Sequence, residues 1–329
     1  MTIMPRRRVL AAATAAGSVV TAASLALIAP SPSYAAWPAA DPYALAPYTD
    51  MSNSQEGMLD TAITQHGLKA YTAAFVIGSG CTQIWGDTLP VGNDPYTDPE
   101  IARAKSEGAS VIISSGGAAG FPLAWTCTTQ SSIDAGYQNI IDSYGVNWLD
   151  FDVEGAAVAY PDAIARNMQA MKDLKAANPG LKFSMTLPVL PSGLTGDGVN
   201  IIRAAATAQI RIDVVNVMAM DYYQGSQDMG QAAINAATNT LAQMRSVDSA
   251  YTAANVGITP MIGVNDDGST FTLEDAQQVR SWATANGIGR LAFWSVNRDQ
   301  PCAGGSGGGA SPICSGVSNP AGAFVDAFK

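Results

Sequence analysis

The chain has 329 residues, of which 47% are hydrophobic and only 13% are charged, and this composition excludes an intrinsically disordered protein. Acidic residues outnumber basic ones by 27 to 17, so the net charge is −10, and we expect no nucleic-acid partner for a surface that repels polyanions. The single histidine, His66, excludes a three-histidine zinc site and argues against a Ser-His-Asp hydrolase. An enzyme of this composition would work with carboxylates.

The first 35 residues have the pattern of a secretory signal. Three arginines at 6–8 precede an apolar, alanine-rich run over 9–29, and the segment ends in Ser-Tyr-Ala at 33–35. This order is typical of bacterial signal peptides, with cleavage after residue 35 or 36, and it partly matches a twin-arginine signal. The alternative is an uncleaved membrane anchor, since the apolar run is long enough to cross a bilayer. We expect a secreted, extracellular protein without membrane contact after cleavage.

Residues 36–329 read as one domain in which eight short apolar runs alternate with segments of helical spacing. The runs that predict strands are 46–50, 71–77, 110–115, 147–154, 182–187, 214–220, 256–262 and 290–294. The segments that predict helices include 99–107, 133–144, 161–177, 227–247 and 273–286, the last with Thr272 as its N-cap. Runs such as 111–113 are apolar without interruption, as in parallel strands that are covered on both faces. The pattern predicts an α/β fold, a single (β/α)₈ TIM barrel.

A doubly wound open sheet is the alternative fold, but no Gly-x-Gly-x-x-Gly follows the first strand to support it. The four cysteines lack the short C-x-x-C spacing of metal sites, and disulfides are the better interpretation in an exported chain. Cys302 and Cys314 flank a glycine-rich segment and would close it at its base. Cys81 and Cys127 would then form the second bridge, although three pairings are possible.

Three acids alternate along the run 147–154, at Asp150, Asp152 and Glu154. On a strand, a period of two places them on one face, about 6.6 Å apart in succession. In a barrel this face points inward, with Glu154 at the carboxyl end where active sites lie. Like charges in a dry interior cannot all ionise, so at least one should keep a proton, as a general acid requires. A calcium site or a solvated edge strand is the alternative, which the apolar residues between the acids disfavour.

Four motifs in this order resemble those of glycoside hydrolase family 18, the chitinase family. The acidic segment 150–154 is similar to the family signature, and Ser-Ser-Gly-Gly at 114–117 is similar to its Ser-x-Gly-Gly motif. Met-Ala-Met-Asp-Tyr at 218–222 resembles its Met-x-Tyr-Asp motif, and Trp294 matches the tryptophan of the central sugar subsite. The resemblance covers most of residues 36–329, and further segments at 184–191 and 293–299 are similar to a compact prokaryotic branch.

The resemblance implies substrate-assisted, retaining hydrolysis of chitin or chito-oligosaccharides. It assigns Glu154 as the acid that protonates the glycosidic oxygen, while the substrate's own acetamido group attacks C1. Asp152 would orient that acetamido group, and Asp150 would modulate the protonation of Asp152. Asp221 and Tyr222 would contact the acetamido group or the attacking water. The family needs no metal and no cofactor.

Residues that shape the sugar site also follow from the resemblance. The expected substrate-binding residues are Trp294, Met220, Met218, Tyr48, Ser114, Gly116 and Trp125. Ser114, Gly116 and Gly117 are expected to shape the strand end rather more than to touch substrate. Trp85 and Trp125 are candidates for outer sugar sites, with loop packing near the cysteines as the alternative.

Two departures from the family pattern affect single positions. Asn147-Trp148 replaces the usual Asp-Gly before the acids, and Met220 occupies the usual tyrosine position. The missing hydroxyl could come from Tyr222, Tyr48 or Tyr223. Residues 262–290 hold only a loop and one helix, where processive members carry an inserted domain, so we expect an open cleft and endo-type cutting by a monomer. The alternatives are an endo-β-N-acetylglucosaminidase that acts on N-glycan cores, a non-catalytic chitin-binding lectin and, more remotely, a structural sugar-binding protein.

Overall fold

The computed structural model describes residues 41–52, 56–86, 88–225, 227–305 and 308–329. The chain divides into two units, residues 1–34 and 35–329, and all described residues belong to the second. The predicted signal segment lies outside the described residues. Within the described part, no helix combines the length and the apolar character that crossing a membrane requires.

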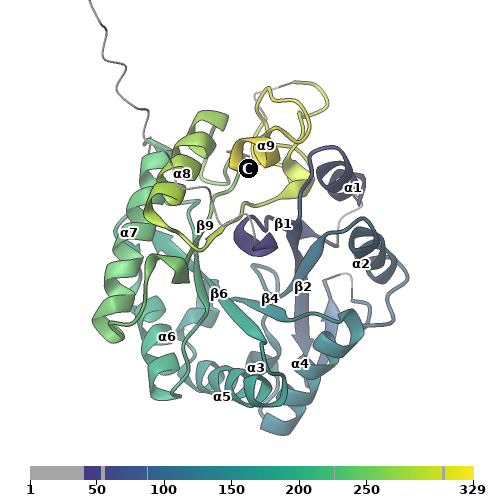
Figure 1. Ribbon diagram of the computed structural model, residues 1–329, viewed down its shortest axis with the longest axis vertical. Helices are drawn as coiled ribbons and strands as arrows, with labels where there is room; N and C mark the ends of the chain where they lie inside the picture. Colours follow the sequence, from purple (N-terminus) through teal and green to yellow (C-terminus); the bar gives the residue numbers. More distant parts are fainter. Residues whose placement is uncertain (1–40, 53–55, 87, 226, 306–307) are drawn as a thin grey trace, which may run out of the picture. The chain divides into compact units, whose positions relative to one another are not determined.

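Eight parallel strands form the central sheet, in an order that follows the chain (Figure 1). They are β1 (Tyr48–Asp50), β2 (Ala70–Ser79), β4 (Ser110–Gly116), β5 (Trp148–Asp152), β6 (Lys182–Leu190), β8 (Val214–Met218), β9 (Val256–Thr259) and β12 (Arg290–Leu291). The sheet curls until its first and last strands meet. There Ala46 N donates to Leu291 O at 2.9 Å and Tyr48 N donates to Phe293 O at 3.0 Å. The predicted (β/α)₈ barrel is confirmed.

Helices cover the outside of the ring, as Figure 1 shows. They are α1 (Glu56–Thr64), α2 (Thr97–Ser106), α3 (Leu123–Thr126), α4 (Gln130–Tyr144), α5 (Pro161–Ala177), α6 (Gly196–Thr207), α7 (Met229–Val247), α8 (Leu273–Asn286) and α9 (Ala323–Phe328). Short 3-10 turns are η1 (Pro42–Ala44), η2 (Gly155–Ala159), η3 (Ala253–Asn255) and η4 (Val296–Arg298). Short antiparallel additions are β3 (Thr82–Trp85) beside β2, β7 (Gly193–Leu194) beside β6, and the pair β10 (Gly263–Val264) and β11 (Thr270–Phe271).

The alternation of β5 determines the placement of the acids. Leu149, Phe151 and Val153 belong to the main hydrophobic core between sheet and helices, where Phe151 packs on the rings of Tyr137 and Phe183. Asp150 and Asp152 lie on the opposite, interior face and are almost fully buried. A strand with period two can therefore satisfy an apolar outer layer and a polar interior at once.

The base of the barrel is filled by a small apolar layer. Trp148, two residues before Asp150, belongs to this layer together with Ala46, Ala70, Ile112 and Val214. The turn η1 covers the layer from below, and the Tyr43 ring lies 5.1 Å from that of Trp148. The acids therefore have a closed, apolar base on one side and the open carboxyl end of the barrel on the other.

The two predicted cysteine pairs are those that the structure contains, Cys81–Cys127 and Cys302–Cys314. The first joins the turn after β2 to the end of α3, and the second closes the loop that follows η4. The predicted cap is also present, since the Thr272 hydroxyl accepts a hydrogen bond from Asp275 N at the start of α8.

Candidate active site

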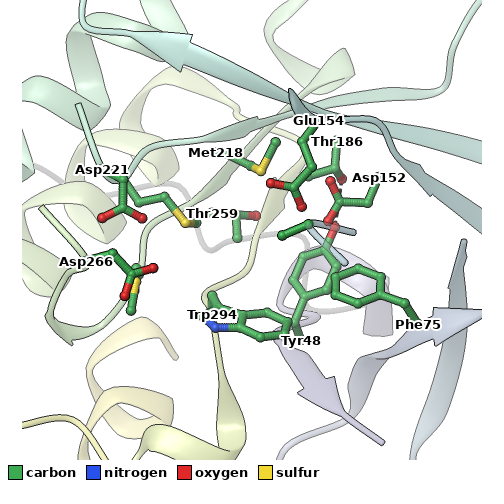
Figure 2. A pocket seen from close by; sticks show the side chains of 13 residues that line it. Tyr48, Phe75, Asp152, Glu154, Thr186, Met218, Asp221, Thr259, Asp266 and Trp294 are labelled. Carbon is green, nitrogen blue, oxygen red and sulfur yellow. Dashed lines mark hydrogen bonds between the residues drawn. The ribbon is translucent and has the colours of Figure 1, made fainter. Parts of the chain in front are cut away.

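A cavity of about 270 Å³ opens at the carboxyl end of the barrel, directly above the interior acids. Figure 2 shows Asp152 and Glu154 on one side of it and Asp221 with Asp266 on the other. The lining residues are Tyr48, Phe75, Ala118, Asp152, Glu154, Thr186, Met218, Met220, Asp221, Thr259, Met261, Asp266 and Trp294. They come from all eight barrel strands or the segments that follow them, so the cavity is a product of the closed ring.

Asp150 lies below the cavity and is surrounded by hydroxyl groups. Its Oδ2 accepts from Tyr48 at 2.9 Å and from Ser114 at 2.7 Å. Its Oδ1 accepts from Ser184 at 2.6 Å and from Thr186 at 3.0 Å. The Tyr48 and Thr186 hydroxyls also lie 2.7 Å from each other, and each has one hydrogen, so when these two share a hydrogen bond the shell donates three hydrogens to Asp150.

Asp152 has the opposite surroundings. Its Oδ1 is buried without a hydrogen-bond partner among the described residues. Burial, with smaller contributions from Glu154 and Asp150, raises its pKa well above the usual range. The group therefore favours a proton, and it gains most from a ligand that brings a hydrogen-bond donor.

Glu154 follows β5 at the rim of the cavity. Burial, followed by the charge of Asp221, raises its pKa from 4.5 to about 7. Burial also raises the pKa of Asp221, and the nearby Asp266 and Asp267 add to that effect while the backbone N–H of Asp267 opposes it. Glu154 is thus protonated at mildly acidic pH, with its carboxyl group facing the cavity (Figure 2). A group of this kind is suited to donate a proton to a bound substrate.

The aromatic wall of the cavity consists of three side chains. Trp294 stacks on Phe75 with ring centres 5.6 Å apart and an angle of 15°. Tyr48 approaches both rings, at 6.1 Å from Phe75 and 6.2 Å from Trp294. Phe75 thus packs against the indole and fixes its orientation, and the flat surface that remains is of the kind on which sugar rings stack.

Two glycines at the end of β4 allow this close packing. Gly116 has φ +123°, and a Cβ there would lie 2.0 Å from the backbone oxygen of Asp152. At Gly117, φ is +87° and a Cβ would lie 2.7 Å from the ring of Phe75. Both positions need a residue without a side chain, and Gly117 N in turn donates to Asp152 O at 3.1 Å.

The sequence-predicted residues divide into three groups by their position. Glu154, Asp152, Asp221, Trp294, Tyr48, Met218 and Met220 line the cavity. Asp150, Ser114 and Gly116 lie directly beneath it and support it. Tyr222 and Trp125 lie elsewhere: the Tyr222 side chain is buried in the main core, and its hydroxyl has no partner among the described residues. Trp125 is half-buried and donates to Ala157 O at 3.0 Å.

For Trp85 the predicted outer sugar contact is wrong. The side chain is only 1% exposed, packs edge-on against Tyr144 and donates its N–H to the Tyr144 hydroxyl at 2.7 Å. The alternative, a packing role, is correct, although Trp85 lies on strand β3 and not in a loop: β3 folds back on β2 and turns this tryptophan toward α4.

Several lining residues were not predicted. Phe75 lies within β2, where it reads as another core residue, and Thr259 and Met261 lie at the end of β9. Asp266 belongs to the turn between β10 and β11, and its sequence context of Asn, Asp and Gly indicates only a turn. An acid in a turn that follows a barrel strand is the one signal that could have identified it. Among the described residues, no cluster of three or more His, Cys, Asp or Glu side chains has the arrangement of a metal site.

Comparison with known proteins finds relatives that are all named as chitinases, although no protein-family model matches the chain. The catalytic domain of a hyperthermophilic chitinase from Pyrococcus furiosus is 37% identical, with a TM-score of 0.77 over 86% of this chain and 93% of that one. A probable bifunctional chitinase/lysozyme of Escherichia coli (strain K12) is 32% identical over 287 residues, or 81% of this chain. Endochitinase 11 of Metarhizium anisopliae is 31% identical over 286 residues, or 82% of this chain. The chain covers 32% and 54% of the length of these two curated relatives.

Proposed function

Because this chain belongs to the chitinases of glycoside hydrolase family 18, we propose that it hydrolyses β-1,4 linkages between N-acetylglucosamine units of chitin or chito-oligosaccharides. The observation that carries the proposal is the position of Glu154. It is an acid with a raised pKa that faces a cavity, and Asp152 and a stacked tryptophan lie on the same cavity. A lectin of this fold would have no need for a proton donor at that place.

The arrangement supports retaining, substrate-assisted chemistry. Glu154 donates its proton to the glycosidic oxygen while the acetamido oxygen of the sugar above Trp294 attacks C1 and forms an oxazolinium ion. The unpartnered Oδ1 of Asp152 is available to accept the acetamido N–H. Glu154, now ionised, then takes a proton from water. That water attacks C1 and opens the oxazolinium ring with net retention. Asp221, across the cavity, is within the same space and would bind the acetamido group or the water.

Proton NMR of chitopentaose digestion tests this proposal. The wild type should release β-anomeric products first, and Glu154→Gln should reduce the rate by at least about 10³-fold because the general acid is lost. Glu274→Gln is the matched control, an exposed glutamate in the first turn of α8, and should keep wild-type activity. Oligomer binding without cleavage by a folded wild type would indicate a lectin. Cleavage of N-glycan cores alone would indicate an endo-β-N-acetylglucosaminidase.

The pH dependence of the rate provides a second test. Glu154 must be protonated to act as the acid, and its pKa is about 7. The value of kcat should therefore decrease about tenfold per pH unit above pH 7, measured on chitopentaose in buffers of constant ionic strength. A rate that remains constant to pH 9 would contradict the role of Glu154.

We also propose endo-type cutting by a secreted protein. Between β9 and α8 the chain forms only the short β10–β11 pair, which supports an open cleft. Cutting within the chain predicts that a long oligomer yields products of several lengths from the start, as mass spectrometry of early time points would detect. Early release of the disaccharide alone would contradict it.

The two disulfides support an oxidising, extracellular location.

A further inference from the structure

Below the acids, the barrel interior contains a buried arginine that the proposed mechanism does not use. Arg290 is the first residue of β12, and only 2% of it is exposed. Its guanidinium lies over the Trp148 ring, 4.1 Å from the ring centre, and one of its nitrogens, Nη2, is buried without a partner. Burying a cation with an unmade hydrogen bond destabilises a protein, so a structural role alone explains this residue poorly.

A short hydrogen-bond relay connects Arg290 to the acids. Its Nη1 donates to the Ser184 hydroxyl at 3.0 Å, and Ser184 donates to Asp150 Oδ1 at 2.6 Å. A guanidinium can only donate, so the oxygen of Ser184 must accept this bond. The hydroxyl hydrogen of Ser184 is directed to Asp150 Oδ1, so the relay runs from the guanidinium through the hydroxyl to the carboxyl group.

The titratable groups around this relay come from several elements. They are Asp152 on β5, Tyr48 on β1, Tyr43 and Asp41 at η1, and Lys182 on β6. Asp152 and Asp41 are acidic, and the two tyrosines are neutral at ordinary pH. Lys182 is exposed and lies 4.9 Å from the centre of the Trp148 ring. Arg290 is therefore the cation that contacts the Asp150 shell from within the barrel.

We propose that Arg290 is a positioning residue that acts through Ser184 to keep Asp150 ionised, so that the catalytic proton resides on Asp152 and Glu154. This inference rests on the proposed function. Arg290 touches no substrate, because Asp150 and its shell of hydroxyl groups separate it from the cavity. Its effect reaches the reacting atoms as a charge that Asp150 presents to Asp152.

The first test compares pH profiles of kcat/KM on chitopentaose. In Arg290→Met, Asp150 loses its counter-charge and takes a proton more readily, so the acidic limb should move to higher pH by about one unit or more. Arg290→Lys should restore most of the wild-type profile, and KM should change little in either variant. Lys182→Met is the matched control, because it removes another cation that lies over the same indole, and it should leave the limb in place.

Ser184→Ala provides an independent arm if Arg290→Met does not fold. It keeps the arginine and removes the relay, so the acidic limb should move in the same direction by a smaller amount. The proposal would be overturned if the acidic limb of both folded variants stayed at the wild-type pH. If Arg290→Met does not fold, an unshifted limb in Ser184→Ala alone would overturn it. A merely structural role would reduce the melting temperature and leave the limb where it is.

Carboxyl carbon-13 NMR separates this inference from the proposed function. With labelled aspartate, the Asp150 signal is assigned by its loss in Asp150→Asn. It should titrate at higher pH in Arg290→Met and Ser184→Ala than in the wild type, and unchanged titration would overturn the proposal. If the wild type cleaves no oligomer, the proposed function fails, and this titration alone still decides whether Arg290 maintains the charge of Asp150.

Discussion

Asp150 and Asp152 lie two residues apart on one strand, yet their surroundings give them opposite chemistry. Four hydroxyl groups surround Asp150, whereas Asp152 Oδ1 has no partner among the described residues. The difference is one of depth. Asp150 lies where neighbouring strands supply small polar side chains, and Asp152 lies where the cavity begins. Identical carboxyl groups thereby differ in role: Asp150 accepts hydrogen bonds from its neighbours, and burial makes Asp152 favour a proton.

The raised pKa of Glu154 predicts a pH-dependent loss of stability. Below pH 4.5 the group is protonated in both states and has no effect. As pH rises to 7, the unfolded chain ionises and the folded protein does not, so stability decreases, by about 3 kcal/mol once pH exceeds 7. Urea unfolding should find Glu154→Gln equal to the wild type at pH 4 and more stable at pH 8.

The exposed Glu274→Gln should follow the wild type at every pH in the same experiment. Because Asp152 and Asp299 also have raised pKa values, the wild-type curve contains their contributions. The difference between the wild type and Glu154→Gln therefore reports Glu154 together with its effect on Asp152. Parallel curves for Glu154→Gln and the wild type would show that the pKa is not raised.

The end of β4 is the element on which the geometry of β5 depends. A Cβ at Gly116 would lie 2.0 Å from Asp152 O, whereas Gly180, at φ +90°, has open space around it. Gly180→Ala therefore measures backbone strain alone, about 1 kcal/mol. Gly116→Ala should destabilise by several times more and displace Asp152, with a loss of activity that Gly180→Ala does not share. Equal melting temperatures for the two variants would contradict this account.

Elements with a regular pattern were predicted well from the sequence. The helices over 161–177 and 273–286 have the predicted bounds, because each has a clear first turn and an apolar stripe. Helix α6 was not predicted, since Gly196 and Gly198 lie in its first turn and read as a loop. There the Thr195 cap and the buried Ile201 and Ile202 outweigh the low propensity of glycine.

Strand ends were the least predictable part of the barrel. The apolar run 214–220 extends past β8, which ends at Met218, because Met218 and Met220 line the cavity. Hydrophobicity alone cannot distinguish a ladder residue from a cavity wall. The acids of β5 were predictable because their alternation is visible within one short segment. Phe75 and Asp266 were not predictable, because they come near the acids only after the barrel closes.

At the scale of the whole molecule, the two disulfides constrain segments of different length. Cys81–Cys127 spans 46 positions and Cys302–Cys314 spans 12. The entropy of loop closure predicts losses of about 4 and about 3 kcal/mol when the pairs are replaced by serine. Thermal unfolding of the two double variants should show the larger decrease for the first pair. The opposite ranking would show that local packing, and not chain entropy, dominates.

The ligands of Asp150 also bear on how the protein folds. Its hydroxyl partners come from β1, β4 and β6, and the relay to Arg290 adds β12, the strand that closes the ring against β1. In a barrel without β1 or β12 in place, the Asp150 carboxyl group would have lost part of its hydration before all of its hydrogen-bond partners were present. Partly assembled barrels are therefore destabilised around Asp150. Catalytic competence should appear late and all at once during refolding, when the first and last strands join.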